Sequence, residues 1–76
     1  DKIGMLATVM NCIYVSEIFR AAGMKTAVMT PFACGAFTEL FSKDDAVKNL
    51  EEGVVTFLQE EQDIHIYYNF IGYIEV

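Results

Sequence analysis

The longest regular pattern in the sequence is an apolar repeat of helical spacing across residues 3–22. It consists of two neighbouring rows of apolar side chains: Met5, Val9 and Ile13, and Leu6, Met10, Tyr14 and Ile18. Side chains three or four positions apart lie on the same side of a helix, so the two rows predict one helix with a wide apolar side. Gly23 can adopt the left-handed conformation that commonly follows a helix end. The pattern therefore predicts a helix over residues 3–22.

The middle of the sequence alternates strand and helix signals. Residues 25–30 predict a short buried strand that ends at Pro31, and residues 37–41 predict an added helical turn. Ser42, with an acidic residue three positions later, predicts the capped start of a second helix that closes at Gly53. Residues 54–58 predict a second strand. The order helix, strand, helix, strand is typical of an α/β fold.

From residue 59 the pattern changes to a period of two. A polar turn at 60–63 precedes apolar side chains at nearly alternate positions: Ile64, Ile66, Tyr68, Phe70, Ile74 and Val76. This spacing predicts a strand or hairpin, with Gly72 as a candidate bulge. The fold class expected from the sequence is therefore α/β with a β-like C-terminal tail.

Composition excludes several classes of function. The 76 residues carry a net charge of −6 and only five Lys and Arg. These basic residues do not cluster, so no surface for nucleic acid is expected. No uninterrupted apolar run reaches the roughly 18–20 residues that a membrane span needs. Cys12 and Cys34 lack the spacing of a disulfide framework, and both are expected to be reduced thiols in a cytoplasmic protein.

The sequence offers no catalytic or metal-binding constellation. His65 is the only histidine, and only Asp63 lies at a ligand-like spacing from it, which favours a surface strand residue over a metal ligand. Cys34 stands beside Gly35 in a predicted loop with no base near it in sequence, which favours a structural role over a nucleophile. We therefore expect no catalytic residue and no metal site.

The run from Gly4 to Asn11, with Asp1 three residues before it, resembles a helix of the bacterial uridylate (UMP) kinases of the amino-acid-kinase superfamily. The resemblance covers about residues 1–57. It implies a partial amino-acid-kinase domain over 1–57, from a three-layer α/β/α fold, and a divergent tail over 58–76. It also implies that Asp1 binds UMP, because its carboxylate can accept two hydrogen bonds from the ribose diol. The alternative is a first-turn acid that stabilises the helix dipole.

The function that the resemblance implies is transfer of the ATP γ-phosphate to UMP, giving UDP in pyrimidine nucleotide biosynthesis. The intact family uses ATP and Mg²⁺, and its members are expected to be homo-oligomers. The family's glycine-rich phosphate-binding segments have no counterpart here, and the chain starts at Asp1, so we expect an inactive fragment that needs no cofactor. The alternative is a small non-catalytic α/β interaction module.

The tail departs from the family where the phosphate-binding segment should begin. Residues 58–67 can be encoded by a nucleotide string that, read from its third base, gives Ala-Gly-Gly-Thr-Gly-His-Pro-Tyr, which is the segment found in the family. No backbone cradle for phosphate can form from the residues present. The sequence therefore predicts a frame-shifted tail from about Leu58.

Overall fold

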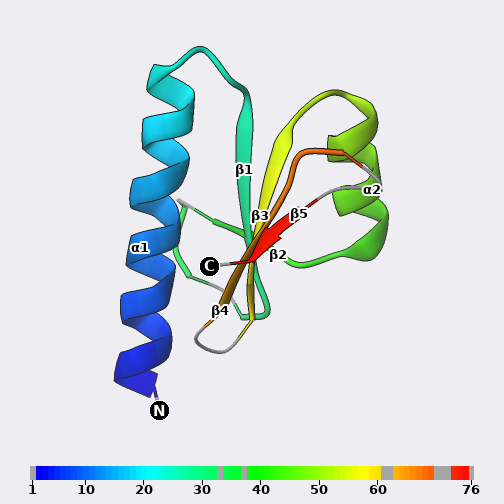
Figure 1. Cartoon of the computed structure of the whole chain (residues 1–76). Helices are drawn as coiled ribbons and strands as arrows, with labels where there is room; N and C mark the ends of the chain where they lie inside the picture. Colours follow the sequence, from blue (N-terminus) through cyan, green and yellow to red (C-terminus); the bar gives the residue numbers. More distant parts are fainter. Residues whose placement is uncertain (1, 33, 37, 61–62, 70–72, 76) are drawn as a thin grey trace.

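The computed structural model describes residues 2–32, 34–36, 38–60, 63–69 and 73–75. Its elements follow the order α1 (Lys2–Ala21), β1 (Thr26–Thr30), β2 (Glu39–Leu40), α2 (Lys43–Glu51), β3 (Val55–Glu60), β4 (Asp63–Tyr67) and β5 (Tyr73–Glu75). The strands form one mixed sheet in the order β2-β1-β3-β4-β5. β2, β1 and β3 are parallel, whereas β4 and β5 are antiparallel to their neighbours. Figure 1 shows α1 and α2 on opposite sides of this sheet.

α1 can lie on the sheet with polar residues inward because carbonyl groups of the same helix accept hydrogen bonds from their hydroxyls. Thr8 and Ser16 are buried, and their hydroxyls donate to the Gly4 and Ile13 carbonyls at 3.0 and 2.9 Å. The helix ends as the sequence predicts, with Gly23 at a φ of 95° and its N–H bonded to the Arg20 carbonyl. A positive φ of this kind costs a glycine little, so the chain can turn directly into β1.

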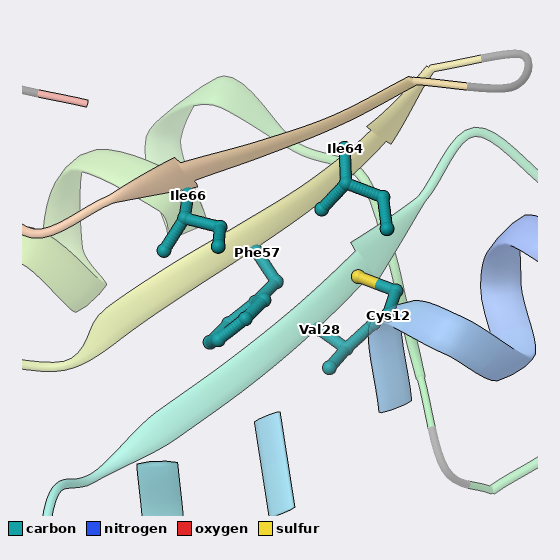
Figure 2. Close-up of a cluster of buried hydrophobic side chains, with 5 residues drawn as sticks. All are labelled: Cys12, Val28, Phe57, Ile64 and Ile66. Carbon is teal, nitrogen blue, oxygen red and sulfur yellow. The ribbon is translucent and has the colours of Figure 1, made fainter. Parts of the chain in front are cut away.

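The core lies between α1 and the sheet, and Phe57 of β3 is at its centre. Val28 of β1 and Ile66 of β4 are the register partners of Phe57 on either side. Register partners point to the same face of a sheet, so the three side chains form a row beneath α1. Cys12 and Ile64 complete the buried cluster shown in Figure 2. Burying a side chain such as Phe57 stabilises the fold by about 1.5–3 kcal/mol.

The second helix begins where the sequence predicts. Ser42 is extended and accepts a hydrogen bond from the Asp45 N–H at 3.4 Å, while Asp44 and Asp45 lie in the first turn. Both carboxylates therefore face the positive end of the helix dipole. Gly53, at a φ of 76°, ends the helix and returns the chain to β3.

Most predicted elements are confirmed, and one is wrong. Residues 39–40 of the predicted helical turn form β2 instead, and the Phe41 N–H donates to the Thr30 carbonyl at 2.7 Å. The reason is tertiary, because pairing with β1 satisfies backbone groups that a single isolated turn would leave open. The β-like tail is confirmed as β4 and β5, although the predicted bulge at Gly72 lies outside the described residues.

The α/β class is confirmed, whereas the amino-acid-kinase fold and the division at residue 57 stay predictions. β3 runs from Val55 to Glu60 and so crosses the predicted division. It ends two residues beyond the predicted strand because β4 pairs with it as far as Glu60↔Asp63.

α1 is also comparable to a membrane-spanning helix in length and mean hydropathy, at 20 residues and 1.2. This differs from the expectation drawn from uninterrupted apolar runs, because the polar residues in α1 are few and scattered. One such helix is weak evidence for a span, since core helices meet the same criterion. Here one side of α1 packs on the sheet through Val9 and Cys12.

Removing the cap of α2 should measurably weaken the fold. We expect Ser42→Ala to lower the free energy of unfolding by about 1 kcal/mol, because the Asp45 N–H loses its side-chain acceptor. Urea unfolding followed by circular dichroism would measure the change. Ser42→Asp is the matched control and should keep nearly all of the stability. Equal stability of the alanine variant and the parent chain would contradict the role of the cap.

Candidate functional site

A pocket of about 380 Å³ lies where the first turns of α1 meet the chain after β1. Its lining residues are Lys2, Met5 and Leu6 from α1 and Phe32 from the segment after the strand. In α/β folds, ligands bind at the carboxyl ends of parallel strands, and Phe32 follows the carboxyl end of β1. The pocket is therefore placed where a ligand site is expected.

The chemistry of this pocket suits a flat, weakly polar group with a negative charge beside it. Met5, Leu6 and Phe32 supply apolar surface, and an aromatic ring such as that of Phe32 can stack on a planar ligand. Lys2 is exposed and adds an ammonium group that can pair with an anion. Met5, Leu6 and Phe32 carry no group that could act as a general base.

Asp1, the residue that the resemblance assigns to UMP, lies outside the described residues. Its neighbour Lys2 is the first residue of α1 and lines the pocket. The sequence therefore places Asp1 next to a pocket-lining residue, and its contact with a ribose stays a prediction.

Two threonines hold the segment that carries Phe32. Thr30, which is fully buried, donates its hydroxyl to the Phe32 carbonyl at 2.6 Å and lies 3.3 Å from the Thr38 hydroxyl. Thr38 in turn donates to the Cys34 carbonyl at 3.2 Å. These contacts join the start and the end of the segment that connects β1 to β2. Sequence reasoning missed both residues, although a threonine just before a proline at a strand end is a known turn signal.

The two cysteines are free thiols with different surroundings. Cys12 lies in the core, and burial raises the pKa of its thiol from 9.0 to about 12. A thiolate is the reactive form of cysteine, so Cys12 is inert at neutral pH. Cys34 is half-buried in the segment between β1 and β2.

His65 lies on β4 and is half-buried, with its ring centroid 6.5 Å from that of Tyr67. Within the part of the chain that the structure describes, no three His, Cys, Asp or Glu side chains are grouped so that they could hold a metal ion. A metal-assisted phosphoryl transfer needs such a group, and the described residues supply none.

Comparison with known proteins finds similarity to uridylate kinases. The chain is 39% identical over 56 residues to a uridylate kinase of Porphyromonas gingivalis, covering 74% of this chain and 23% of that protein. It is 40% identical over 55 residues to the chloroplastic uridylate kinase PUMPKIN of Arabidopsis thaliana, covering 72% and 16%. A uridylate kinase of Nitrobacter hamburgensis is 36% identical over 58 residues, covering 76% and 24%.

The chain thus spans about a quarter or less of the length of these relatives. No family profile matches it, and no solved structure matches it. The similarity supports a segment related to uridylate kinases, as the run from Gly4 to Asn11 predicts.

Burial of Cys12 should make stability depend on pH in the alkaline range. Below pH 9.0 the thiol is protonated in both the folded and unfolded chain, so its contribution is constant. Between pH 9.0 and about 12 only the unfolded thiol ionises. Linkage therefore lowers the unfolding free energy by up to about 1.36 kcal/mol per pH unit.

Urea unfolding of Cys12→Ala and the parent chain at several pH values would measure this effect. We expect the difference between their unfolding free energies to narrow above pH 9. The parent loses stability as its unfolded thiol ionises, whereas the variant lacks this thiol. Cys34→Ala is the control and should keep the parent's alkaline decline. A gap that stays constant up to pH 11 would contradict the assigned burial effect.

Proposed function

We propose that this chain is a fragment of a UMP kinase, the phosphotransferase that moves the ATP γ-phosphate to UMP to give UDP in pyrimidine nucleotide biosynthesis. The observation that carries the proposal is the 34–40% identity to several uridylate kinases over about 55 residues. The matched stretch in each case covers 72–76% of this chain. A cytoplasmic location is part of the same proposal.

The pocket at the start of α1 supports a nucleotide as the ligand. Its apolar walls suit a pyrimidine ring, and Lys2 at its rim suits a negatively charged group. In the proposed arrangement the carboxylate of Asp1 accepts hydrogen bonds from the two ribose hydroxyls. The ribose, the base and the negative charge of UMP would then be contacted by residues at the start of α1 and by Phe32.

The 76-residue chain alone is proposed to be inactive. Phosphoryl transfer depends on positioning the phosphates and neutralising their charge, and ATP and Mg²⁺ would be bound by parts of the intact enzyme. The described residues provide no metal-binding group for this purpose. Binding of UMP by the isolated chain should also be weak, because the parts of the intact enzyme that would hold the phosphate do not contribute to it.

A second candidate function, a small interaction module, is favoured by the outer side of α1. Five large apolar side chains on this side are 49–80% exposed: Ile3, Leu6, Met10, Tyr14 and Ile18. We call these residues the α1 stripe. A contiguous exposed apolar surface of this kind marks a site of protein contact.

The α1 stripe also supports the proposal that the parent enzyme is a homo-oligomer. Two copies of α1 packed antiparallel about Met10 would place Leu6 of one copy against Tyr14 of the other. The same arrangement brings Lys2 near Glu17 of the second copy. Such a contact is self-complementary and therefore compatible with a two-fold axis.

Self-association through the α1 stripe can be tested directly. We expect Met10→Glu to abolish concentration-dependent dimerisation, because it would place two like charges together at the centre of the contact. Sedimentation equilibrium of the chain would measure the change. Lys43→Glu, on the exposed start of α2, changes charge elsewhere and is the control. Dimerisation unaffected by Met10→Glu would exclude the stripe as the contact.

The frame-shifted origin of the tail is proposed on the sequence match alone. Sequencing the source DNA tests it. Codons that cannot give the glycine-rich segment in another frame would refute the frame shift, while leaving the kinase relationship of residues 1–57 in place.

A chimeric enzyme gives the sharpest test of the kinase proposal. The 56-residue matching segment of the Porphyromonas gingivalis uridylate kinase would be replaced by the corresponding residues of this chain. We expect the chimera to phosphorylate UMP in an ADP-coupled assay. Asp1→Asn in the chimera should raise the KM for UMP at least tenfold, because the neutral side chain accepts ribose hydrogen bonds less strongly (about 1.4 kcal/mol).

The isolated chain is the matched control for that experiment. We expect no ADP formation and no saturable UMP binding below about 1 mM, which corresponds to about 4 kcal/mol. Isothermal titration would measure the binding. Micromolar binding by the isolated chain would contradict the proposed dependence on missing parts, and a folded but inactive chimera would contradict the kinase proposal.

A further inference from the structure

The outer edge of β1 is covered along only part of its length. β2 pairs with β1 at Met29↔Glu39 and Thr30↔Leu40 and nowhere else. On its other edge β1 is paired with β3 from Thr26↔Val55 onward. Among the residues that the structure describes, no strand pairs with the outer edge at residues 26–28.

The backbone groups at this open edge can be assigned from neighbouring bonds. Val55 donates its N–H to the Lys25 carbonyl, so residue 25 points its backbone groups toward β3. Successive residues of a strand point their groups to alternate sides, so Thr26 and Val28 point theirs outward. The Thr26 carbonyl receives the Arg20 guanidinium at 3.4 Å. Among the strands that the structure describes, none pairs with the outward N–H groups of Thr26 and Val28, so an added strand could accept hydrogen bonds from them.

A groove of about 270 Å³ runs along this open edge, between α1 and the segment before β2. Thr26, Ala27 and Val28 form its floor. Its walls are polar, with Ser16, Glu17 and Arg20 on α1 and Thr38 and Glu39 on the other side. The groove therefore brings together the N–H groups of Thr26 and Val28, with which no described strand pairs, and side chains that can form hydrogen bonds.

The charges in the groove favour a basic occupant. Glu17 and Glu39 each contribute a carboxylate, and both are exposed. Among the described lining residues Arg20 is the one cation. Its guanidinium already contacts the Thr26 hydroxyl at 3.2 and 3.4 Å and the Thr26 carbonyl. One acidic charge is thus left in excess, in a chain whose net charge is −6. A lysine or arginine entering the groove would pair with it.

We propose that this groove binds an extended peptide segment bearing a basic side chain, which adds to the sheet as a strand in line with β2. The open edge of three residues is roughly 10 Å long at the rise of a strand. Main-chain hydrogen bonds to Thr26 and Val28 would supply part of the affinity, as in other cases of strand addition. The proposal goes beyond nucleotide binding and uses none of the residues of the α1 pocket.

A second copy of the chain fits this edge less well than a basic peptide. Pairing of two β1 edges would bring Glu17 and Glu39 of one copy toward the same carboxylates of the other. Like charges placed together at an interface disfavour association. Charge complementarity therefore selects a partner of opposite sign.

The test uses the folded chain and a synthetic probe, acetyl-Thr-Val-Lys-Val-Thr-amide, in an NMR titration. We expect saturable shifts centred on the amides of Thr26 and Val28, together with slower hydrogen exchange of both. The variant Glu17→Lys/Glu39→Lys should weaken binding at least tenfold. Glu51→Lys, on α2, is the matched control and should bind as the parent chain does. A probe with glutamate in place of lysine should bind at least tenfold more weakly.

Several results would overturn the proposal. One is the absence of saturable shifts at millimolar probe in a chain whose spectrum is folded. Another is equal affinity for the double variant and the parent chain, or shifts centred on the α1 stripe. Protection of the Thr26 and Val28 amides that appears without probe and grows with chain concentration would assign the edge to a second copy.

Discussion

The contact between Phe57 and its neighbours holds the two halves of the chain together. Phe57 is fully buried, and its ring meets that of Phe19 edge-on, with centroids 5.3 Å apart. Phe19 lies near the end of α1, whereas Val28 and Ile66 flank Phe57 on β1 and β4. A single side chain thus touches or adjoins the helix, the parallel strands and the antiparallel tail. In so small a chain a few such contacts make up much of the core, because the buried fraction of surface falls with size.

The parts of the fold that depend on local chemistry could be predicted from the sequence. The apolar period defined α1, and the Ser42 cap and Gly53 defined α2. β2 could not be predicted in this way, because two residues form a strand only when β1 offers an edge to pair with. The same limit applies to Thr30 and Thr38, whose hydroxyls meet because the chain between them folds back. Of the candidate site, only the start of α1 was predicted, and that came from a resemblance.

The two sides of α1 differ in what covers them, and the exposed side relates to the small part of the relatives' length that this chain matches. On the inward side, the hydroxyls of Thr8 and Ser16 donate hydrogen bonds to carbonyls of the helix itself, which allows that side to pack on the sheet. The outward side presents the α1 stripe, which nothing in the described chain covers. A chain that matches 16–25% of its relatives' length is expected to expose surfaces that a complete protein buries. Either the rest of a complete protein or a second copy of the chain would cover the stripe through the same apolar contacts.

The tail shows how little a sheet requires of a sequence compared with a phosphate site. Ile64 and Ile66 lie beside Gln59 and Phe57 in the sheet, and all four side chains are buried. An alternating apolar pattern, paired in register with β3, is sufficient to bury one face of a strand. Many sequences satisfy so simple a pattern, so it places little demand on which residues form the tail. A phosphate cradle demands far more, since successive backbone N–H groups must converge on one anion and glycine is required where the backbone turns sharply. Packing with period two therefore tolerates many choices of residue, whereas phosphate binding does not.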